Sequence, residues 1–202
     1  MTHGADPLDL ERSALKEWAV LVDAMGRGEI VTMVRKGGIR EQRAGFSVRY
    51  DRFVLYPTYF HEKAAELAPR FLPTLEASHA RRPPEGRIGL ELVAEVVGVW
   101  RVDDLSRLRT IEGEHGLTPA AVESRFHYKN RPGVQVVATR VLRLPAPVVL
   151  PEARRYGGCV SWVELDDAVP LAGAVPVLAR EALDAHLQRL SWALGPLTVN
   201  PG

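Results

Sequence analysis

The sequence predicts an α+β fold in which a mostly antiparallel or mixed, barrel-like sheet is flanked by helices. Strand-like segments cluster in groups joined by short loops and do not alternate strictly with helices, which argues against a doubly wound parallel sheet. The 202 residues are 46% hydrophobic and 25% charged, as in soluble globular proteins. We expect one domain over residues 1–202, with residues 1–9 flexible and residues 166–202 forming a C-terminal helical extension.

The first predicted element is a helix from Leu10 to Met25, because apolar residues recur there at helical spacing. Gly26 and Gly28 end it by offering a left-handed cap. The next apolar run predicts a strand over Glu29–Arg35, after which two glycines allow a sharp turn.

Residues 46–75 contain two strand patterns, followed by a helical pattern that is interrupted. Alternation of apolar and polar residues predicts a half-buried strand over 46–51, and the apolar run Phe53–Tyr56 predicts another. Together with Glu29–Arg35, these segments suggest an early β-hairpin. Residues 59–75 have helical spacing that is broken at Pro69 and Pro73.

The segment Arg87–Val102 has the strongest strand signal because β-branched residues and a tryptophan dominate its centre. Gly98 predicts a bulge within it. Asp103 or Asp104 is suited to cap a short helix that runs to Arg109.

The C-terminal half continues with helix, strand, strand and helix. Thr118 and Pro119 predict a helix start, as N-cap and first helical residue. Strands are expected over Gly133–Leu144 and Cys159–Leu165. Leucines at helical spacing predict a final helix over 183–194.

Net charge and cysteine content indicate which binding partners and which cellular location to expect. The formal net charge of +1 gives no global attraction to nucleic acid or membranes, although arginine supplies 22 of the 26 basic residues. Cys159 is the single cysteine, so we expect the protein to be located in the reducing cytoplasm. We expect Cys159 itself to be a small buried residue. Residues 1–9 do not have the composition of a signal peptide, and no apolar stretch is long enough to span a membrane.

Four short segments resemble a bacterial domain-of-unknown-function family, the one numbered eighteen hundred and two. They are Ala-Leu-Lys-Glu-Trp (14–18), Arg-Lys-Gly-Gly-Ile (35–39), Leu-Tyr-Pro-Thr (55–58) and Gly-Gly-Cys-Val-Ser-Trp (157–162). This family has no established activity that the resemblance could transfer.

A more remote resemblance is to ASCH domains of the PUA-like superfamily. A helix, a glycine-rich turn and a strand ending in Arg35 are similar to the start of an ASCH domain, and the segments 95–102, 103–108, 114–118 and 136–144 are similar in order to its later elements. This resemblance implies a small β-barrel that binds RNA or modified nucleotides. Some ASCH members hydrolyse acylated nucleosides or cleave RNA, but Ile30 and Met33 stand where the ASCH signature has lysine and glutamate.

Basic residues gather in the segment 35–52, where six cations face two acids. We therefore predict a nucleic-acid-binding pocket built on the first β-hairpin by Arg35, Lys36, Arg40, Arg49 and Arg52. The aromatic residues interleaved with them suit either a hydrophobic core or an RNA-binding surface; they are Phe46, Tyr50, Phe53 and Tyr56.

Whether the protein is an enzyme stays open at this stage. Candidate catalytic residues are Thr32, Lys36, Glu95, His61 and His115, each of which also has a plausible structural or surface role. The alternatives to a binding module are a nucleoside-acyl hydrolase of the ASCH kind and a metal-dependent, restriction-endonuclease-like nuclease. None of the four lysines stands two residues after an acid, which disfavours the nuclease.

We expect no cofactor and no metal site, because no pair of histidines has zinc-like spacing and one cysteine cannot form a cysteine-rich site. A metal would require scattered carboxylates such as Glu17, Glu91 and Glu95 to converge. We instead interpret Glu17 as a buried partner of Arg35. RNA or a nucleotide is the expected ligand and a membrane is not expected, while a protein partner or a homo-oligomer stays open.

Overall fold

The computed structural model describes residues 11–36, 48–158 and 160–196 of the chain. Its framework is a seven-stranded mixed sheet with strand order β2-β5-β4-β3-β1-β6, in which β7 pairs with β5. The strands are β1 (Ser13–Trp18), β2 (Thr32–Arg35), β3 (Arg52–Thr58), β4 (Arg87–Val102), β5 (Val134–Pro151), β6 (Trp162–Glu164) and β7 (Val175–Pro176). The pair β1·β3 is parallel, and the other pairs are antiparallel. The predicted α+β class with a mixed sheet is confirmed.

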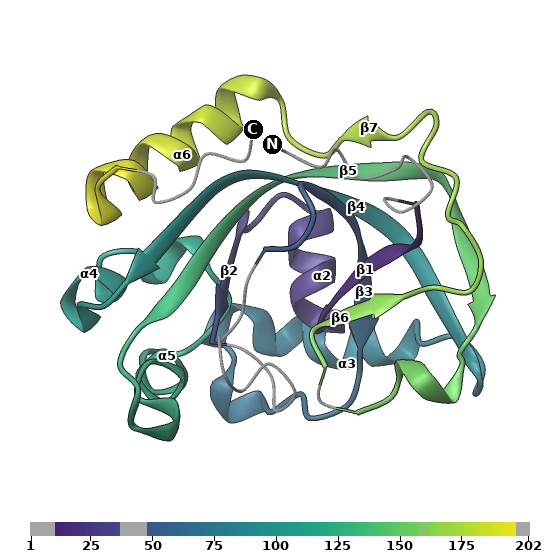
Figure 1. Ribbon diagram of the computed structural model, residues 1–202, viewed down its shortest axis with the longest axis horizontal. Coiled ribbons are helices and arrows are strands. Elements are labelled where there is room, and N and C mark those ends of the chain that lie inside the picture. Colours follow the sequence, from purple (N-terminus) through teal and green to yellow (C-terminus); the bar gives the residue numbers. More distant parts are fainter. Residues whose placement is uncertain (1–10, 37–47, 159, 197–202) are drawn as a thin grey trace.

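The sheet curls around one helix, as Figure 1 shows. The α-helices are α2 (Ala19–Gly26), α3 (Leu72–Ala80), α4 (Leu105–Arg109), α5 (Pro119–Phe126) and α6 (Arg180–Leu194). Helix α2 lies within the curve of the sheet and packs against β3 and α3, whereas α6 contacts β4 and α4. Short 3₁₀ turns cover Ala64–Glu66, Pro69–Phe71, Glu112–Glu114, Tyr128–Asn130 and Arg154–Tyr156.

Both faces of the central strands are buried, which explains why these strands read as continuous apolar runs. In β3, Phe53 and Leu55 pack with α2 in one apolar cluster. Val54 and Tyr56, on the opposite face, belong to a second cluster beneath the segment after β5. Successive strand residues point to opposite faces, so a sheet covered on both sides requires apolar residues at every position. Phe53 and Tyr56 are therefore core residues.

The curl brings strand β2, at one edge of the sheet, next to β1 near the other edge. Nη1 of Arg35 in β2 donates hydrogen bonds to the backbone oxygen of Lys16 (3.0 Å) and to the carboxylate of Glu17 (3.1 Å). Two strands separated by three others in the sheet order can meet in this way only if the sheet is half closed. The structure is thus a half-barrel.

Most predicted elements of the middle and the C-terminal half are confirmed. Strand β4 spans the predicted residues, with a register shift between Val96 and Gly98. Asp104 caps α4 by accepting from the Ser106 amide (2.9 Å). Thr118 is the N-cap of α5, and the first residue of this helix is Pro119. Helix α6 ends at Leu194, before a glycine with positive φ.

The predicted helix over Leu10–Met25 is wrong in its first half. Residues 13–18 form strand β1, and the helix begins only at Ala19. Ala, Leu, Lys and Glu favour helices intrinsically, but β1 pairs with β3 on one side and β6 on the other, and these tertiary contacts outweigh propensity.

The expected early β-hairpin is also absent from the described sheet. Strand β2 pairs with β5, and β3 pairs with β4 and β1, so the two segments are not neighbours. Of the strand predicted over 46–51, residues 46–47 lie outside the described residues, and 48–50 are not in a strand. The predicted helix over 59–75 is replaced by short turns, and α3 starts at Leu72 with Pro73 in its first turn, where proline is tolerated.

No helix in the described ranges combines the length and the apolar character needed to cross a membrane. Cys159 lies outside the described residues.

Candidate functional site

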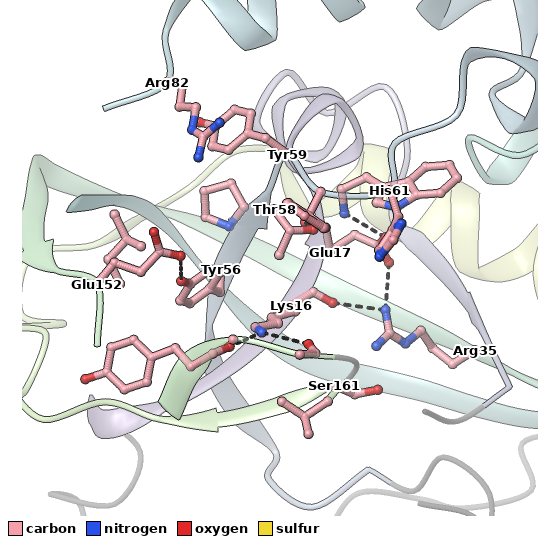
Figure 2. A pocket seen from close by; sticks show the side chains of 18 of the residues that line it. Lys16, Glu17, Arg35, Tyr56, Thr58, Tyr59, His61, Arg82, Glu152 and Ser161 are labelled. Carbon is pink, nitrogen blue, oxygen red and sulfur yellow. Dashed lines mark hydrogen bonds and ion pairs between the residues drawn. The ribbon is translucent and has the colours of Figure 1, made fainter. Parts of the chain in front are cut away.

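A cavity of about 680 Å³ opens beside the C-terminal ends of β1 and β3. Its walls come from distant parts of the chain: β1, the end of β2, the segment Tyr56–His61, the start of β4, the end of α5 and the segment 152–161. Figure 2 shows labelled side chains of β1, β2, β3 and the segment after it, together with Arg82, Glu152 and Ser161, around one space. Volumes of this size are typical of small-molecule and cofactor sites.

The lining is strongly basic. Six cationic side chains face two carboxylates, Glu17 and Glu152, which leaves a formal excess of four positive charges in a chain whose total is +1. The cations are Lys16, Arg35, Lys36, Arg82, Arg87 and Arg125. Low-dielectric walls focus such a field, so the cavity attracts anions.

Glu17 and Arg35 form a buried ion pair at one end of the cavity. Their side chains are only 5% and 12% exposed, and the carboxylate also accepts from the Trp18 amide (2.9 Å). The pairing interpreted from the sequence is therefore present. One carboxylate here serves two guanidinium groups, because Arg125 also lies within electrostatic range of Glu17.

Arg125 is half-buried at the end of α5. Its Nη1 donates to the backbone oxygen of Val34 (3.0 Å), and its guanidinium lies over the Trp18 ring, 5.4 Å from the centroid. Burial lowers the pKa of Arg125, while the nearby Glu17 opposes this effect. The group contributes positive charge to the cavity wall from a fixed position.

The two lysines of the lining are engaged by backbone carbonyls. Lys16 donates to the carbonyl oxygens of Tyr156 and Gly158 and lies 5.6 Å from the centroid of the Tyr56 ring. Lys36 donates to the carbonyl oxygens of Phe126 (3.0 Å), Arg131 and Gly133. Burial, and then the neighbouring cations Arg101 and Arg131, lower the pKa of Lys36. Lys36 therefore ties β2 to the end of α5.

Arg82 and Arg87 are the exposed cations of the wall, one on each side of the turn before β4. The guanidinium of Arg82 stacks on Tyr59, 5.2 Å from its centroid, as Figure 2 shows. Neither arginine forms an ion pair with an acid of the described ranges. Their donor groups are therefore available to an anionic ligand.

Aromatic rings are interleaved with these cations. They are Trp18, Tyr56, Tyr59, Phe60, Tyr128 and Tyr156. The Tyr56 hydroxyl donates to Oε1 of Glu152 (2.6 Å); burial, followed by this hydrogen bond, raises the pKa of Tyr56, so the phenol stays protonated. The Tyr156 ring stands edge-on to Tyr56 at 6.4 Å.

Of the residues predicted from the sequence, the cavity brings together Arg35, Lys36 and His61. Arg49 and Arg52 do not line it, and Arg40 lies outside the described residues. Arg52 instead forms an ion pair with Glu95 across the β3·β4 pair.

The other catalytic candidates lie away from the cavity. Thr32 is buried and donates its hydroxyl to the backbone oxygen of Glu114. Glu95 pairs with Arg52 and with Arg140 (3.5 Å).

His115 is 1% exposed and accepts from the Leu117 amide through Nδ1 (3.2 Å). Burial, with smaller contributions from Arg125 and Arg70, lowers the pKa of His115 to about 4, so the ring is neutral near pH 7. Its position inside the fold suits a structural role.

Among the described residues, no group of three His, Cys, Asp or Glu side chains is placed to hold a metal ion. The three carboxylates considered from the sequence occupy separate ion pairs. Glu17 pairs with Arg35, Glu91 with Arg143 (3.5 Å) and Glu95 with the two arginines already named.

Sequence reasoning did not place Lys16, Arg87 or Arg125 in the site. A usable signal was nevertheless present: each of the four segments that resemble the family contributes to this cavity. Residues 16–18, 35–36 and 56–58, together with 157, 158, 160 and 161, all line it. Segments far apart in sequence thus converge on one cavity.

Comparison with known proteins agrees with the first resemblance. The family model described as "Domain of unknown function (DUF1802)" matches residues 14–189, and the chain belongs to this family. No curated protein matches.

Two solved structures are similar to this chain, both of ASCH from Zymomonas mobilis. The crystal structure of a ZmASCH point mutant has 12% identity and a TM-score of 0.44, covering 89% of this chain and 96% of that chain. The crystal structure of ASCH has 12% identity and a TM-score of 0.42, covering 91% and 96%.

Proposed function

We propose that this protein binds RNA or a modified nucleotide, and that the cavity beside β1 and β3 holds one nucleotide unit. The observation that carries the proposal is the coincidence, in a single cavity of about 680 Å³, of an excess of four positive charges with six aromatic rings. A nucleotide combines a phosphate with a flat base, and these two kinds of side chain recognise the two parts.

Some cations of the lining are exposed and others are held by protein partners, and this difference suggests how the ligand is oriented. Arg82 and Arg87 are exposed and can offer several N–H donors to a phosphate. Lys16, Arg35 and Arg125 are held by protein partners, so they add to the positive potential without having to reorganise. The base would contact the tyrosine rings on the inner wall.

Glu152 supports recognition of a base over recognition of an inorganic anion. It is exposed in the cavity and accepts from Tyr56 through one carboxylate oxygen. A second oxygen can accept from the amino or imino groups of a base, in the way that carboxylates recognise the amino group of cytosine. A site for phosphate alone would gain nothing from a carboxylate there.

A cytoplasmic location is part of this proposal, because RNA and nucleotides are available there and the chain contains one cysteine. The enzymatic alternatives gain no specific support from the geometry of the described residues, since the acids considered for them are held in separate ion pairs.

The test is a fluorescence anisotropy titration of a labelled single-stranded RNA hexamer, with competition by the four ribonucleoside monophosphates. We expect RNA affinity to fall as salt rises from about 50 to 300 mM, with a log–log slope of about −0.7 for each phosphate contacted. Arg82→Gln and Arg87→Gln should each weaken binding. Each should also make the slope shallower by about 0.7, the value expected for one phosphate contact.

Arg109→Gln is the matched control, because Arg109 is an exposed arginine on α4 outside the cavity. It should leave both affinity and slope unchanged. Binding that is indifferent to salt, or equal losses in the control and in the cavity variants, would contradict the proposal.

A further inference from the structure

Two aromatic rings stand exposed at the mouth of the cavity. Phe60 is 77% exposed and Tyr128 is 42% exposed, and both line the cavity. A single exposed apolar side chain is ordinary and requires no explanation. What distinguishes these two rings is that both line one charged cavity.

Both rings share the cavity lining with a stacked pair of flat groups. The guanidinium of Arg125 lies over the Trp18 ring. Thr58, two residues before Phe60, pairs in register with Trp18, and Tyr128 follows Arg125 by three residues. Phe60, Trp18, Arg125 and Tyr128 all line the cavity, so it presents several flat surfaces to a ligand.

The backbone next to each ring has an uncommon conformation. In the described part of the chain, the non-glycine residues with positive φ are His61 (63°), Lys129 (56°) and Asn130 (53°). His61 directly follows Phe60, and Lys129 and Asn130 are the two residues after Tyr128. Residues held in this region cluster at ligand sites, because the surrounding structure must stabilise a conformation that costs free energy.

The charges of the rim favour a polyanion over an apolar protein surface. Nζ of Lys129 lies 5.4 Å from the centroid of the Tyr128 ring, and Arg125 lines the same cavity as the two exposed rings. Lysine is depleted in protein–protein interfaces. Grooves that bind single-stranded nucleic acid instead combine cations with rings on which successive bases stack.

We propose that the ligand is a single-stranded nucleic acid with one nucleotide inserted in the cavity, and that its neighbouring bases stack on Phe60 and Tyr128. This inference rests on the proposed nucleotide-binding function and deepens it by excluding a free mononucleotide as the preferred ligand. The sugar-phosphate chain would pass along the rim between the two rings.

The test compares a labelled single-stranded RNA hexamer with the ribonucleoside monophosphates on the full chain. Base–aromatic stacking predicts that Phe60→Ala and Tyr128→Ala each weaken hexamer binding by about 5- to 150-fold. In both variants the hexamer should lose at least about fivefold more affinity than the monophosphates lose. Phe60→Trp should retain hexamer affinity, because tryptophan also offers a flat face.

Trp192→Ala is the control, since Trp192 is 88% exposed on α6 and does not line the cavity. It should leave both affinities unchanged. Hexamer affinity equal to that of a monophosphate, or unchanged in both rim variants, would overturn this inference while leaving nucleotide binding intact. Failure of both ligands to bind would overturn the proposed function as well.

A protein partner at the rim is the competing outcome. If Phe60→Ala leaves RNA affinity unchanged but shifts the sedimentation coefficient from that of a dimer to that of a monomer, the rings form a protein interface. That result would also overturn the inference.

Discussion

Replacing Glu17 by glutamine should be among the most destabilising single changes at the cavity. The carboxylate lies 3.1 Å from Arg35, and the two side chains are 5% and 12% exposed. At an effective dielectric constant of about 20, opposite charges about 4 Å apart attract by about 4 kcal/mol. Glutamine has nearly the same volume and can still accept from the Trp18 amide, so the substitution mainly removes charge.

The loss in unfolding free energy should be about 2–4 kcal/mol. Removing one partner of a buried pair typically costs about 3–5 kcal/mol, and the residual exposure of Arg35 at the cavity places this pair toward the lower end. Without Glu17, the guanidinium groups of Arg35 and Arg125 repel each other, and Glu66 is a weaker electrostatic partner of Arg125 than Glu17 was. Arg35→Gln should cost less, because Arg125 still lies within electrostatic range of Glu17.

Urea denaturation monitored by circular dichroism measures these differences by linear extrapolation. The double variant Glu17→Gln/Arg35→Gln completes a cycle, and we expect it to be less destabilised than the sum of the two single variants. If Glu17→Gln unfolds within about 0.5 kcal/mol of the unmodified protein, or if Arg35→Gln is the costlier change, the electrostatic account of this end of the cavity is refuted.

Three further predictions concern the packing of the fold outside the cavity lining. His115 has a folded pKa of about 4 against an ordinary 6.5, so the unfolded chain binds an extra proton between these values and stability falls as pH drops through that window. By pH 4 the loss is about 3 kcal/mol, and urea titrations at several pH values should show His115→Asn losing less than the unmodified protein. A Cβ on Gly116 would overlap a core leucine of α2, so Gly116→Ala should cost about 1–3 kcal/mol and lower the Tm. Gly113→Ala, which meets nothing within 4 Å, should leave the Tm nearly unchanged. The indole of Trp100 donates to the Gly195 carbonyl (2.9 Å), so Trp100→Phe should release the end of α6 and speed its cleavage by trypsin; unchanged cleavage would contradict this role.

The sequence allowed prediction of those elements whose local signals agreed with their tertiary context. β-branched residues and a tryptophan dominate the centre of strand β4, and Thr118 and Pro119 mark the start of α5 locally. Strand β1 was mistaken for a helix because its own residues favour one. Its pairing partners lie far away in the chain, at 52–58 and 162–164, and no local pattern reveals them.

The composition of the site was harder to predict than the fold. Arg35 is predicted as a pocket residue because it stands at the end of an apolar strand, and it does line the cavity. Arg52 was chosen because it is close in sequence, but strand order takes it to a different ion pair, with Glu95. Lys16 was not predicted as a site residue because its segment was predicted to be a helix. Proximity along the chain is a poor guide where neighbouring segments enter different parts of a sheet.

The place of β1 in the sheet has a consequence for synthesis of the protein. Ser13–Trp18 is the first described strand to leave the ribosome, yet one of its two neighbours, Trp162–Glu164, is among the last. Until that segment emerges, the nascent chain carries an unpaired strand edge, which is a template for aggregation. The same strand supplies Lys16 and Glu17, so the ligand pocket assembled around them cannot form until Glu152 and Ser161, which also line it, have been synthesised.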